Sequence, residues 1–147
     1  MTTIAWDLNK RAVAVDSRIT TDDGDLITDS AEKRFERRGV VFFLAGSVAD
    51  VEEVTNAFCA GAHRVRKSID VEGIAWTGEK LFELLAERGS LDWHPVVSPQ
   101  GACGSGASFA MAALKDGSTP YRAVKAAARC NVNTGGKIRV HRLRRKA

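Results

Sequence analysis

The first third of the chain consists of short apolar runs separated by polar turns, a pattern that is typical of β-hairpins. The expected strands cover residues 3–8, 12–16, 26–28, 34–38 and 40–45. Turns fall at Asn9-Lys10-Arg11, at Asp22-Asp23-Gly24 and at Gly39. The run 40–45 is apolar throughout, so we expect a strand that is covered on both faces.

Apolar residues at helical spacing then predict three helices. The first begins at Ser47, because Ser47-Val48-Ala49-Asp50 has the form of a capping box with Asp in place of Glu. The second covers residues 105–115 and ends at Asp116-Gly117. The third runs to about Cys130, with Thr119 as N-cap and Pro120 as the first helical residue.

Further strands are expected between and after these helices, at residues 73–78, 80–85, 93–97 and 137–140. Residues 80–88 fit a short helix equally well. The segment between the first helix and Gly73 is too short for another long helix. This order of elements predicts an α+β fold in which two sheets carry helices on their outer faces.

Composition favours one globular domain over residues 1–147, since the chain is 44% apolar. No apolar run reaches the length of a membrane span. Three cysteines without CxxC spacing (Cys59, Cys103 and Cys130) indicate reduced thiols and a cytoplasmic protein. The net charge of +4 is concentrated in a basic tail at about residues 141–147, which we interpret as solvated. The alternative is a contact with nucleic acid or an acidic partner.

Thr2 directly follows the initiator methionine and is the first candidate for chemistry. Removal of Met1 would leave an α-amine and a hydroxyl on neighbouring carbons of Thr2. The amine can take the proton of the hydroxyl, which makes the hydroxyl a nucleophile without a second residue.

Several motifs follow Thr2 in a distinctive order: Thr2-Thr3-Ile4-Ala5, Asp16-Ser17-Arg18, Lys33, Phe42 to Ser47, Gly104-Ser105-Gly106, and Asn131 to Gly136. In this order and spacing they resemble the proteasome β-subunit family, and most closely the HslV-type protease and its short relatives. The resemblance spans nearly the whole chain and is weakest at about residues 63–100. It implies the N-terminal nucleophile hydrolase fold, a four-layer αββα sandwich of two antiparallel sheets, here in a trimmed version.

The resemblance also implies roles for individual residues. Lys33 would place a cation beside the Thr2 hydroxyl and lower the pKa of the α-amine, and Asp16 would pair with Lys33. The backbone N–H of Gly46 would stabilise the oxyanion, although a glycine there also suits the strand-to-helix turn. Ser105 would bond the Thr2 amine, and its alternative is an ordinary N-cap serine.

The late motif departs from the family pattern. Asn131 and Thr134 stand where the family has an aspartate and a serine. Thr134 keeps a hydroxyl, whereas Asn131 can orient groups by hydrogen bonds but cannot offset a cation. The departure is compatible with slower turnover, a compensating residue elsewhere or a silent subunit.

The resemblance places six residues around the substrate side chain before the cut bond: Ile19, Thr20, Ala31, Phe35, Leu44 and Val48, with Glu52 at the far wall. This set favours an apolar substrate residue, and the alternative is that several of these residues belong to the core. The implied assembly is a homo-oligomer of stacked hexameric or heptameric rings that cleaves peptides or unfolded proteins. A separate unfolding ATPase is the implied partner, and no cofactor is expected.

Two other functions remain open. One is a proteolytically silent ring or scaffold protein of the same fold, which Asn131 favours. The other is a nucleic-acid-binding module that uses Arg144 to Lys146. A metal site is not expected, because His63, His94 and His141 are far apart in sequence and lack ligand spacing. The Gly104-Ser105-Gly106 motif lacks the Lys and Ser/Thr of a phosphate-binding loop.

Overall fold

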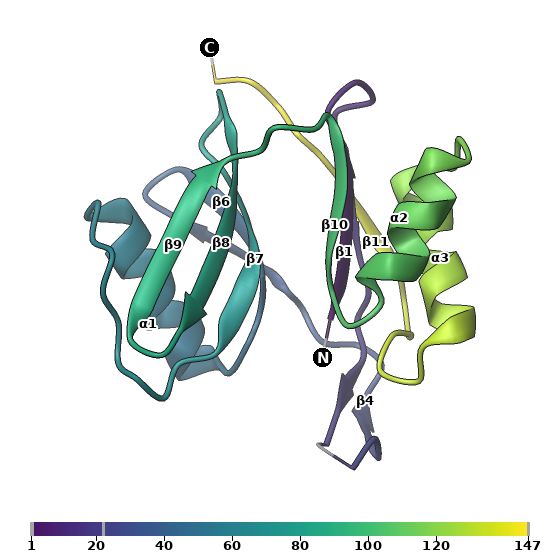
Figure 1. Cartoon of the computed structure of the whole chain (residues 1–147), viewed down its shortest axis with the longest axis horizontal. Helices are drawn as coiled ribbons and strands as arrows, with labels where there is room; N and C mark the ends of the chain where they lie inside the picture. The colour runs from purple at the N-terminus through teal and green to yellow at the C-terminus, as the bar shows by residue number, and fades with distance from the viewer. Residues whose placement is uncertain (1, 22, 147) are drawn as a thin grey trace. The chain divides into compact units, whose positions relative to one another are not determined.

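The structure is a computed structural model that describes residues 2–21 and 23–146. The chain folds into two units (Figure 1). Unit 1 runs to Lys33 and resumes from Ser98 to Arg144, and unit 2 spans Arg34–Val97 and continues from Arg145. That residues 1–147 behave as a single domain stays a prediction.

Unit 1 is built on a four-stranded antiparallel sheet in the order β10-β1-β2-β11. Its elements are β1 (Thr3–Asp7), β2 (Ala12–Val15), β3 (Ile19–Thr20), β4 (Leu26–Thr28), β10 (Gln100–Gly104), α2 (Ala107–Lys115), α3 (Pro120–Cys130) and β11 (Arg139–Arg142). Strands β3 and β4 form a separate hairpin. Helices α2 and α3 pack on the sheet through small residues, chiefly Ala5, Ala14, Ala110, Ala123 and Ala127. These small side chains let the helices approach the sheet and each other closely.

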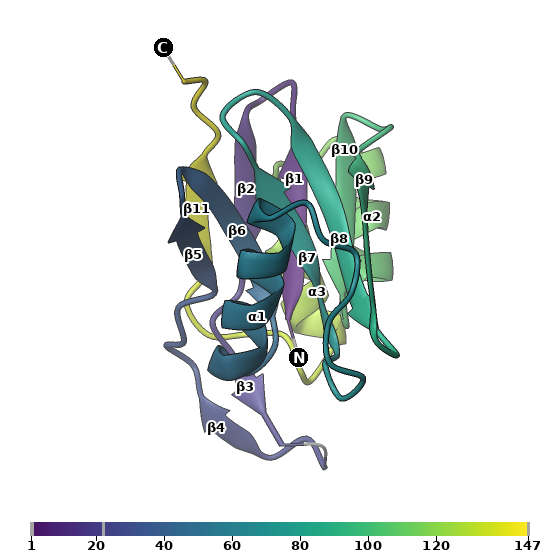
Figure 2. The same cartoon turned by 90° about the vertical axis from the view of Figure 1, so that its left-hand side faces the viewer.

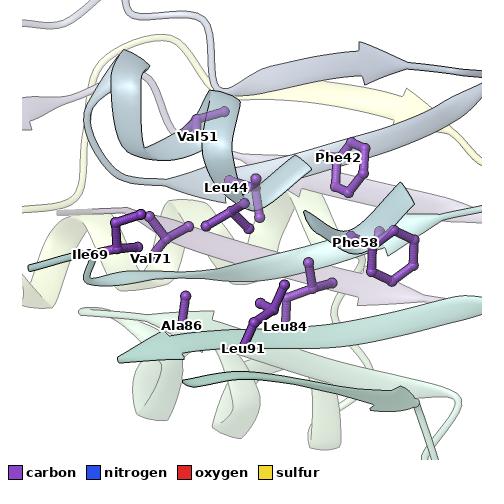
Figure 3. Close-up of a cluster of buried hydrophobic side chains, with 11 residues drawn as sticks. Phe42, Leu44, Val51, Phe58, Ile69, Val71, Leu84, Ala86 and Leu91 are labelled. Carbon is purple, nitrogen blue, oxygen red and sulfur yellow. The ribbon is translucent and has the colours of Figure 1, made fainter. Parts of the chain in front are cut away.

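Unit 2 is a five-stranded sheet in which each strand pairs antiparallel with the next. Its elements are β5 (Arg34–Arg37), β6 (Val40–Ala45), α1 (Val48–Cys59), β7 (Val71–Trp76), β8 (Leu81–Glu87) and β9 (Ser90–Pro95). Helix α1 packs on the sheet through a cluster that includes Phe42, Leu44, Val51 and Phe58 (Figure 3). Each such side chain contributes about 1.5–3 kcal/mol when fully buried.

The predicted elements are largely present. Ser47 caps α1 by accepting a hydrogen bond from the Asp50 N–H (3.3 Å), and Thr119 caps α3 in the same way. Phe42, Phe43 and Leu44 are consecutive and all buried, as expected for a strand covered on both faces. Residues 60–70, all of which the structure describes, contain no helix, in agreement with a trimmed segment.

Leu81–Glu87 form the strand β8, so the strand expected at residues 80–85 is confirmed and the alternative of a short helix is wrong. Two other expectations about local structure are wrong. Helix α2 begins at Ala107, because Ser105 bonds backbone to backbone with Thr2 before the helix starts. The sequence pattern also missed β10, where glycines replace the usual β-branched residues. Gly101 in β10 lies against the indole ring of Trp6, so that a Cβ there would come within 2.1 Å of a ring carbon.

The basic side chains of the tail, at Arg142, Arg144, Arg145 and Lys146, are exposed, in line with a solvated tail, whereas parts of its backbone are paired. Its first residues extend β11, which pairs with β2. Leu143 is buried and donates its N–H to the carbonyl of Arg11 (2.9 Å) in unit 1. Within unit 2, the Lys146 N–H bonds the carbonyl of Gly78 (3.1 Å). The backbone of the tail thus bonds within unit 1 at Leu143 and within unit 2 at Lys146. Among the described helices, none has the length and apolar character to cross a membrane.

Candidate active site

Unit 1 contains a buried ion pair between Asp16 and Lys33. Asp16 directly follows β2, and Lys33 ends the first segment of the unit. The Lys33 Nζ lies 2.8 Å from Asp16 Oδ1, with the two side chains 6% and 0% exposed. Nζ also donates to the carbonyl of Arg18 (2.7 Å). Burial lowers the pKa of the Lys33 ammonium, and the adjacent Asp16 carboxylate opposes that shift.

The Asp16 carboxylate also holds two backbone segments. Its Oδ1 accepts the Thr3 N–H (3.1 Å) and its Oδ2 accepts the Gly135 N–H (3.0 Å). The Asp16 N–H in turn donates to the Thr3 carbonyl (3.3 Å). Both oxygens of a buried carboxylate are thus satisfied, which is the condition for such a charge to be tolerated. Asp16 therefore couples the lysine to the start of β1 and to the late loop.

Thr3, the first residue of β1, and Thr2, which precedes it, are both buried. The Thr2 carbonyl accepts the Ser105 N–H (2.9 Å). The Thr3 Oγ1 accepts the Gly106 N–H (3.0 Å) and lies 2.7 Å from Thr134 Oγ1. The late-motif hydroxyl therefore contacts Thr3, the residue after the candidate nucleophile. Removal of Met1 lies outside the described residues and stays a prediction.

The glycines of the Gly104-Ser105-Gly106 motif are required by close approach to the N-terminal strand. A Cβ on Gly104 would lie 1.7 Å from the Thr2 carbonyl oxygen, and the φ of Gly104 is +97°. A Cβ on Gly106 would lie 2.5 Å from Thr3 Oγ1. Only glycine leaves room for the backbone here. The motif therefore serves to bring Ser105 beside Thr2.

Ser105 is not an N-cap, so that alternative is wrong. The N-cap of α2 is Gly106, which makes no side-chain capping bond. The Ser105 Oγ is buried and has no hydrogen-bond partner among the described residues. A buried hydroxyl without a partner is costly, and it can bond a further polar group.

Asn131 lies at the C-cap of α3 and uses both ends of its amide. Its Nδ2 donates to the Ser105 carbonyl (2.8 Å), and its Oδ1 accepts the Asn133 N–H (2.8 Å). Asn133 Oδ1 in turn accepts the hydroxyl of Thr20 (2.8 Å). Asn131 thus orients the Ser105 segment by neutral hydrogen bonds, and a carboxylate could not donate to that carbonyl.

Five of the predicted residues belong to unit 2: Phe35, Leu44, Gly46, Val48 and Glu52. Phe35 and Val48 line a hollow of about 390 Å³ together with Glu52. Leu44 belongs to the buried core cluster. Gly46 follows β6, and a Cβ there would lie 2.6 Å from Val71 Cγ2, which gives this glycine a packing role. Its role as an oxyanion donor stays a prediction.

The other predicted substrate residues belong to unit 1. Ile19 is exposed and Thr20 is half-buried, both in β3. Ala31 is half-buried, donates its N–H to the Ser17 carbonyl and accepts from Arg139. All of these stay predictions as substrate contacts.

Some residues that build the site were not predicted. Thr3 bonds both Asp16 and Thr134, and Gly135 bonds Asp16. The carbonyl of Arg18 accepts a hydrogen bond from Lys33. The signals available in the sequence are a threonine facing inward in the first strand and the Gly135-Gly136 pair. Within residues 2–21 and 23–146, no group of three or more potential ligands is placed to hold a metal ion.

Comparisons with known proteins identify the fold. No protein-family model matches the chain. No curated protein matches it either. Among solved structures, the chain is similar to the crystal structure of eukaryotic HslV from Trypanosoma brucei, with a TM-score of 0.73 and 20% sequence identity. The alignment covers 95% of this chain and 97% of that chain. The chain therefore has the α+β fold of HslV, with antiparallel sheets and three helices in its described residues, as the sequence resemblance predicts.

Proposed function

We propose that this chain is a threonine-type endopeptidase subunit of a self-compartmentalising ring protease, with Thr2 as its nucleophile after removal of Met1. The observation that carries the proposal is the buried Lys33–Asp16 pair, which hydrogen bonds anchor to the backbone of Thr3. The Asp16 carboxylate serves a structural need, because it accepts the Thr3 and Gly135 N–H groups, and Lys33 adds a buried cation beside the start of the first strand.

In the proposed reaction, the α-amine of Thr2 takes the proton of the Thr2 hydroxyl as Oγ1 attacks the peptide carbonyl. The carbonyl carbon becomes tetrahedral, with the Gly46 N–H stabilising its oxyanion. The C–N bond then breaks, the proton passes to the leaving amine, and an ester on Thr2 remains. Water hydrolyses the ester, which releases the acid product and restores the hydroxyl.

Lys33 would keep the α-amine of Thr2 neutral at physiological pH, since a nearby like charge disfavours its protonation. Ser105 would accept or donate a hydrogen bond at that amine. Its hydroxyl has no partner among the described residues, and its own N–H already bonds Thr2. Asp16 and Thr134 would act on the nucleophile through Thr3.

The proposed substrates carry an apolar residue before the cut bond. The hollow in unit 2 has apolar surface from Phe35, Val48 and Val51, and its lining also includes the charged Arg34, Glu36, Arg37 and Glu52. The proposal also includes stacked homo-oligomeric rings and a separate unfolding ATPase, which rest on the sequence resemblance to the proteasome β-subunit family. It further includes a cytoplasmic location, which rests on the three cysteines without CxxC spacing.

The second candidate is a proteolytically silent ring-forming protein of the same fold. Asn131 favours it, because its amide is committed to Ser105 and Asn133 and supplies no charge. Under this alternative the Lys33–Asp16 pair would serve only to fix the N-terminal strand.

Turnover of a fluorogenic peptide with an apolar residue before the reporter separates the two candidates. The purified chain, with loss of Met1 verified by mass, should release the reporter, and Thr2→Ala should abolish release. Thr28→Ala is the matched control, because the Thr28 side chain bonds Ser30 alone among the described residues. Equal turnover by the unmodified chain and Thr2→Ala would remove Thr2 as the nucleophile. Absence of turnover in a chain that lacks Met1 would favour the silent homologue.

A further inference from the structure

A basic hollow lies on the outer side of α3 in unit 1. It has a volume of about 530 Å³ and includes residues from α3 and from the loop that leads into β11. Its lining includes four cationic side chains, namely those of Arg18, Lys125, Arg129 and Lys137, and no acidic side chain. Tyr121 and Ile138 add apolar surface. We refer to this feature as the basic hollow.

Most of the charge in the basic hollow is uncompensated. Arg18 pairs with Asp29 (2.7 Å), but no described carboxylate lies within ion-pair distance of Lys125, Arg129 or Lys137. Lys125 and Arg129 are four residues apart on one helix, where like charges repel. Lys125 and Arg129 lie on the side of α3 opposite its buried face, which consists of Ala123, Val124 and Ala127. Packing of the core therefore does not require these two cations. The hollow therefore fits an anionic ligand with some apolar surface.

The tip of the β3–β4 hairpin has the complementary character. Asp23 and Asp25 are exposed in its turn, and neither carboxylate has a partner among the described residues. Beside them, Leu26 and Ile27 are 58% and 63% exposed. The turn is held by its own bonds, from Thr21 N–H to the Asp25 carbonyl (2.8 Å) and from Asp25 N–H to Thr21 Oγ1 (3.0 Å). The hairpin tip is therefore ordered by its own hydrogen bonds and exposes both acidic and apolar side chains.

The hairpin of one chain is not free to fold back into its own hollow. Asp29, at the hairpin base, bonds Arg18 through both carboxylate oxygens and accepts the Lys137 N–H at its carbonyl. The base is therefore fixed at the rim of the hollow, and the tip extends away from α2 and α3 (Figures 1 and 2). An acidic tip that projects beside a basic hollow on the same unit suits an exchange between two copies about a two-fold axis.

We propose that the basic hollow receives the acidic β3–β4 tip of a second copy of this chain, and that the two copies exchange tips reciprocally. Asp23 and Asp25 of one copy meet Lys125, Arg129 and Lys137 of the other, and Leu26 and Ile27 are covered in the contact. The inference deepens the assembly part of the proposed function and rests on it. It does not involve the nucleophile.

Charge reversal tests the exchange through sedimentation velocity of the full chain. The unmodified chain should associate, and added salt should weaken the association. Asp23→Lys with Asp25→Lys, and separately Lys125→Glu with Arg129→Glu, should each weaken association at least about tenfold. A 1:1 mixture of the two variants should recover it, because each tip then meets a hollow of opposite charge. Recovery also establishes that both variants are folded.

Matched controls reverse equal charge at exposed positions outside both surfaces: Glu79→Lys with Glu87→Lys, and Lys80→Glu with Lys115→Glu. Association of the reversed variants equal to that of the controls would overturn the proposal. A 1:1 mixture that fails to recover association would also overturn the proposal. The same holds for an unmodified chain that stays monomeric and binds a short DNA duplex through the hollow. Labelling of Thr2 by a covalent inhibitor is measured by mass in the same samples. Loss of association with Thr2 still labelled tests the exchange alone, and absence of labelling tests the peptidase proposal.

Discussion

Replacing Asp16 with alanine should destabilise the protein more than any change at an exposed ion pair. The substitution leaves the Lys33 ammonium 6% exposed without its carboxylate, and the N–H groups of Thr3 and Gly135 lose their acceptor. Breaking a buried pair by removing one partner costs about 3–5 kcal/mol. Each unsatisfied buried N–H costs about 1–3 kcal/mol, and these terms overlap because they share one carboxylate. We therefore expect a loss of at least about 3 kcal/mol in the free energy of unfolding, out of a total of about 5–15 kcal/mol.

Urea denaturation at one fixed protein concentration measures this loss, since any assembly also contributes to apparent stability. Glu36→Ala is the matched control, because it breaks an exposed pair with Arg34 (3.4 Å) and should cost about 1 kcal/mol or less. Asp16→Ala combined with Lys33→Met should lose less than the sum of the two single variants, because no unpaired cation remains. An Asp16→Ala loss no larger than that of Glu36→Ala would refute the buried-pair reasoning.

Three further predictions concern the same unit. Gly104→Ala should destabilise the fold severely, because its Cβ would meet a backbone carbonyl. The control Gly117→Ala has a similar φ of +93° but no atom within 4 Å of the added Cβ, so it should cost about 1 kcal/mol. Equal midpoints of the two variants in thermal melts would contradict this prediction. Because burial lowers the pKa of Lys33 below its ordinary 10.5, the unfolded chain binds more protons just below that pH, so that the unfolding free energy should rise as pH increases through this window. The rise should be absent in Lys33→Met, and parallel curves from urea denaturation at a series of pH values would exclude it. Asn131→Asp should lower stability by about 1–3 kcal/mol, because a carboxylate cannot donate to the Ser105 carbonyl; an unchanged midpoint in urea would argue against that bond.

Much of the fold follows from local sequence signals. The apolar run 40–45, the capping residues Ser47 and Thr119, and the turn at Gly39 each act within a few residues, so that the pattern alone identifies their elements. Strand β10 could not be recognised in this way. Its glycines are explained by Trp6, which lies against Gly101, and by the Thr2 carbonyl, which lies against Gly104, both about a hundred residues earlier in the chain.

The site could be predicted only in part for the same reason. The Asp16–Lys33 pair was expected from the resemblance, and the structure places the two side chains in contact. By contrast, Thr134 bonds Thr3 across 131 residues of sequence. The bond between Ser105 and the Thr2 carbonyl forms only when β1 and β10 pair in the folded unit. Local capping preferences suggested an N-cap at Ser105, and the tertiary pairing of β1 with β10 overrides that preference.

The most direct test of the central claim is the site of covalent labelling by a threonine-directed inhibitor such as a peptide epoxyketone. Intact mass before labelling reports whether Met1 has been removed, and peptide mapping afterwards locates the adduct. We predict a chain lighter by one methionine that gains a single adduct on the peptide beginning at Thr2, and no adduct in Thr2→Ala. A chain that lacks Met1 and remains unlabelled, or carries the adduct on Cys59, Cys103 or Cys130 instead, would contradict the assignment of Thr2 as the nucleophile.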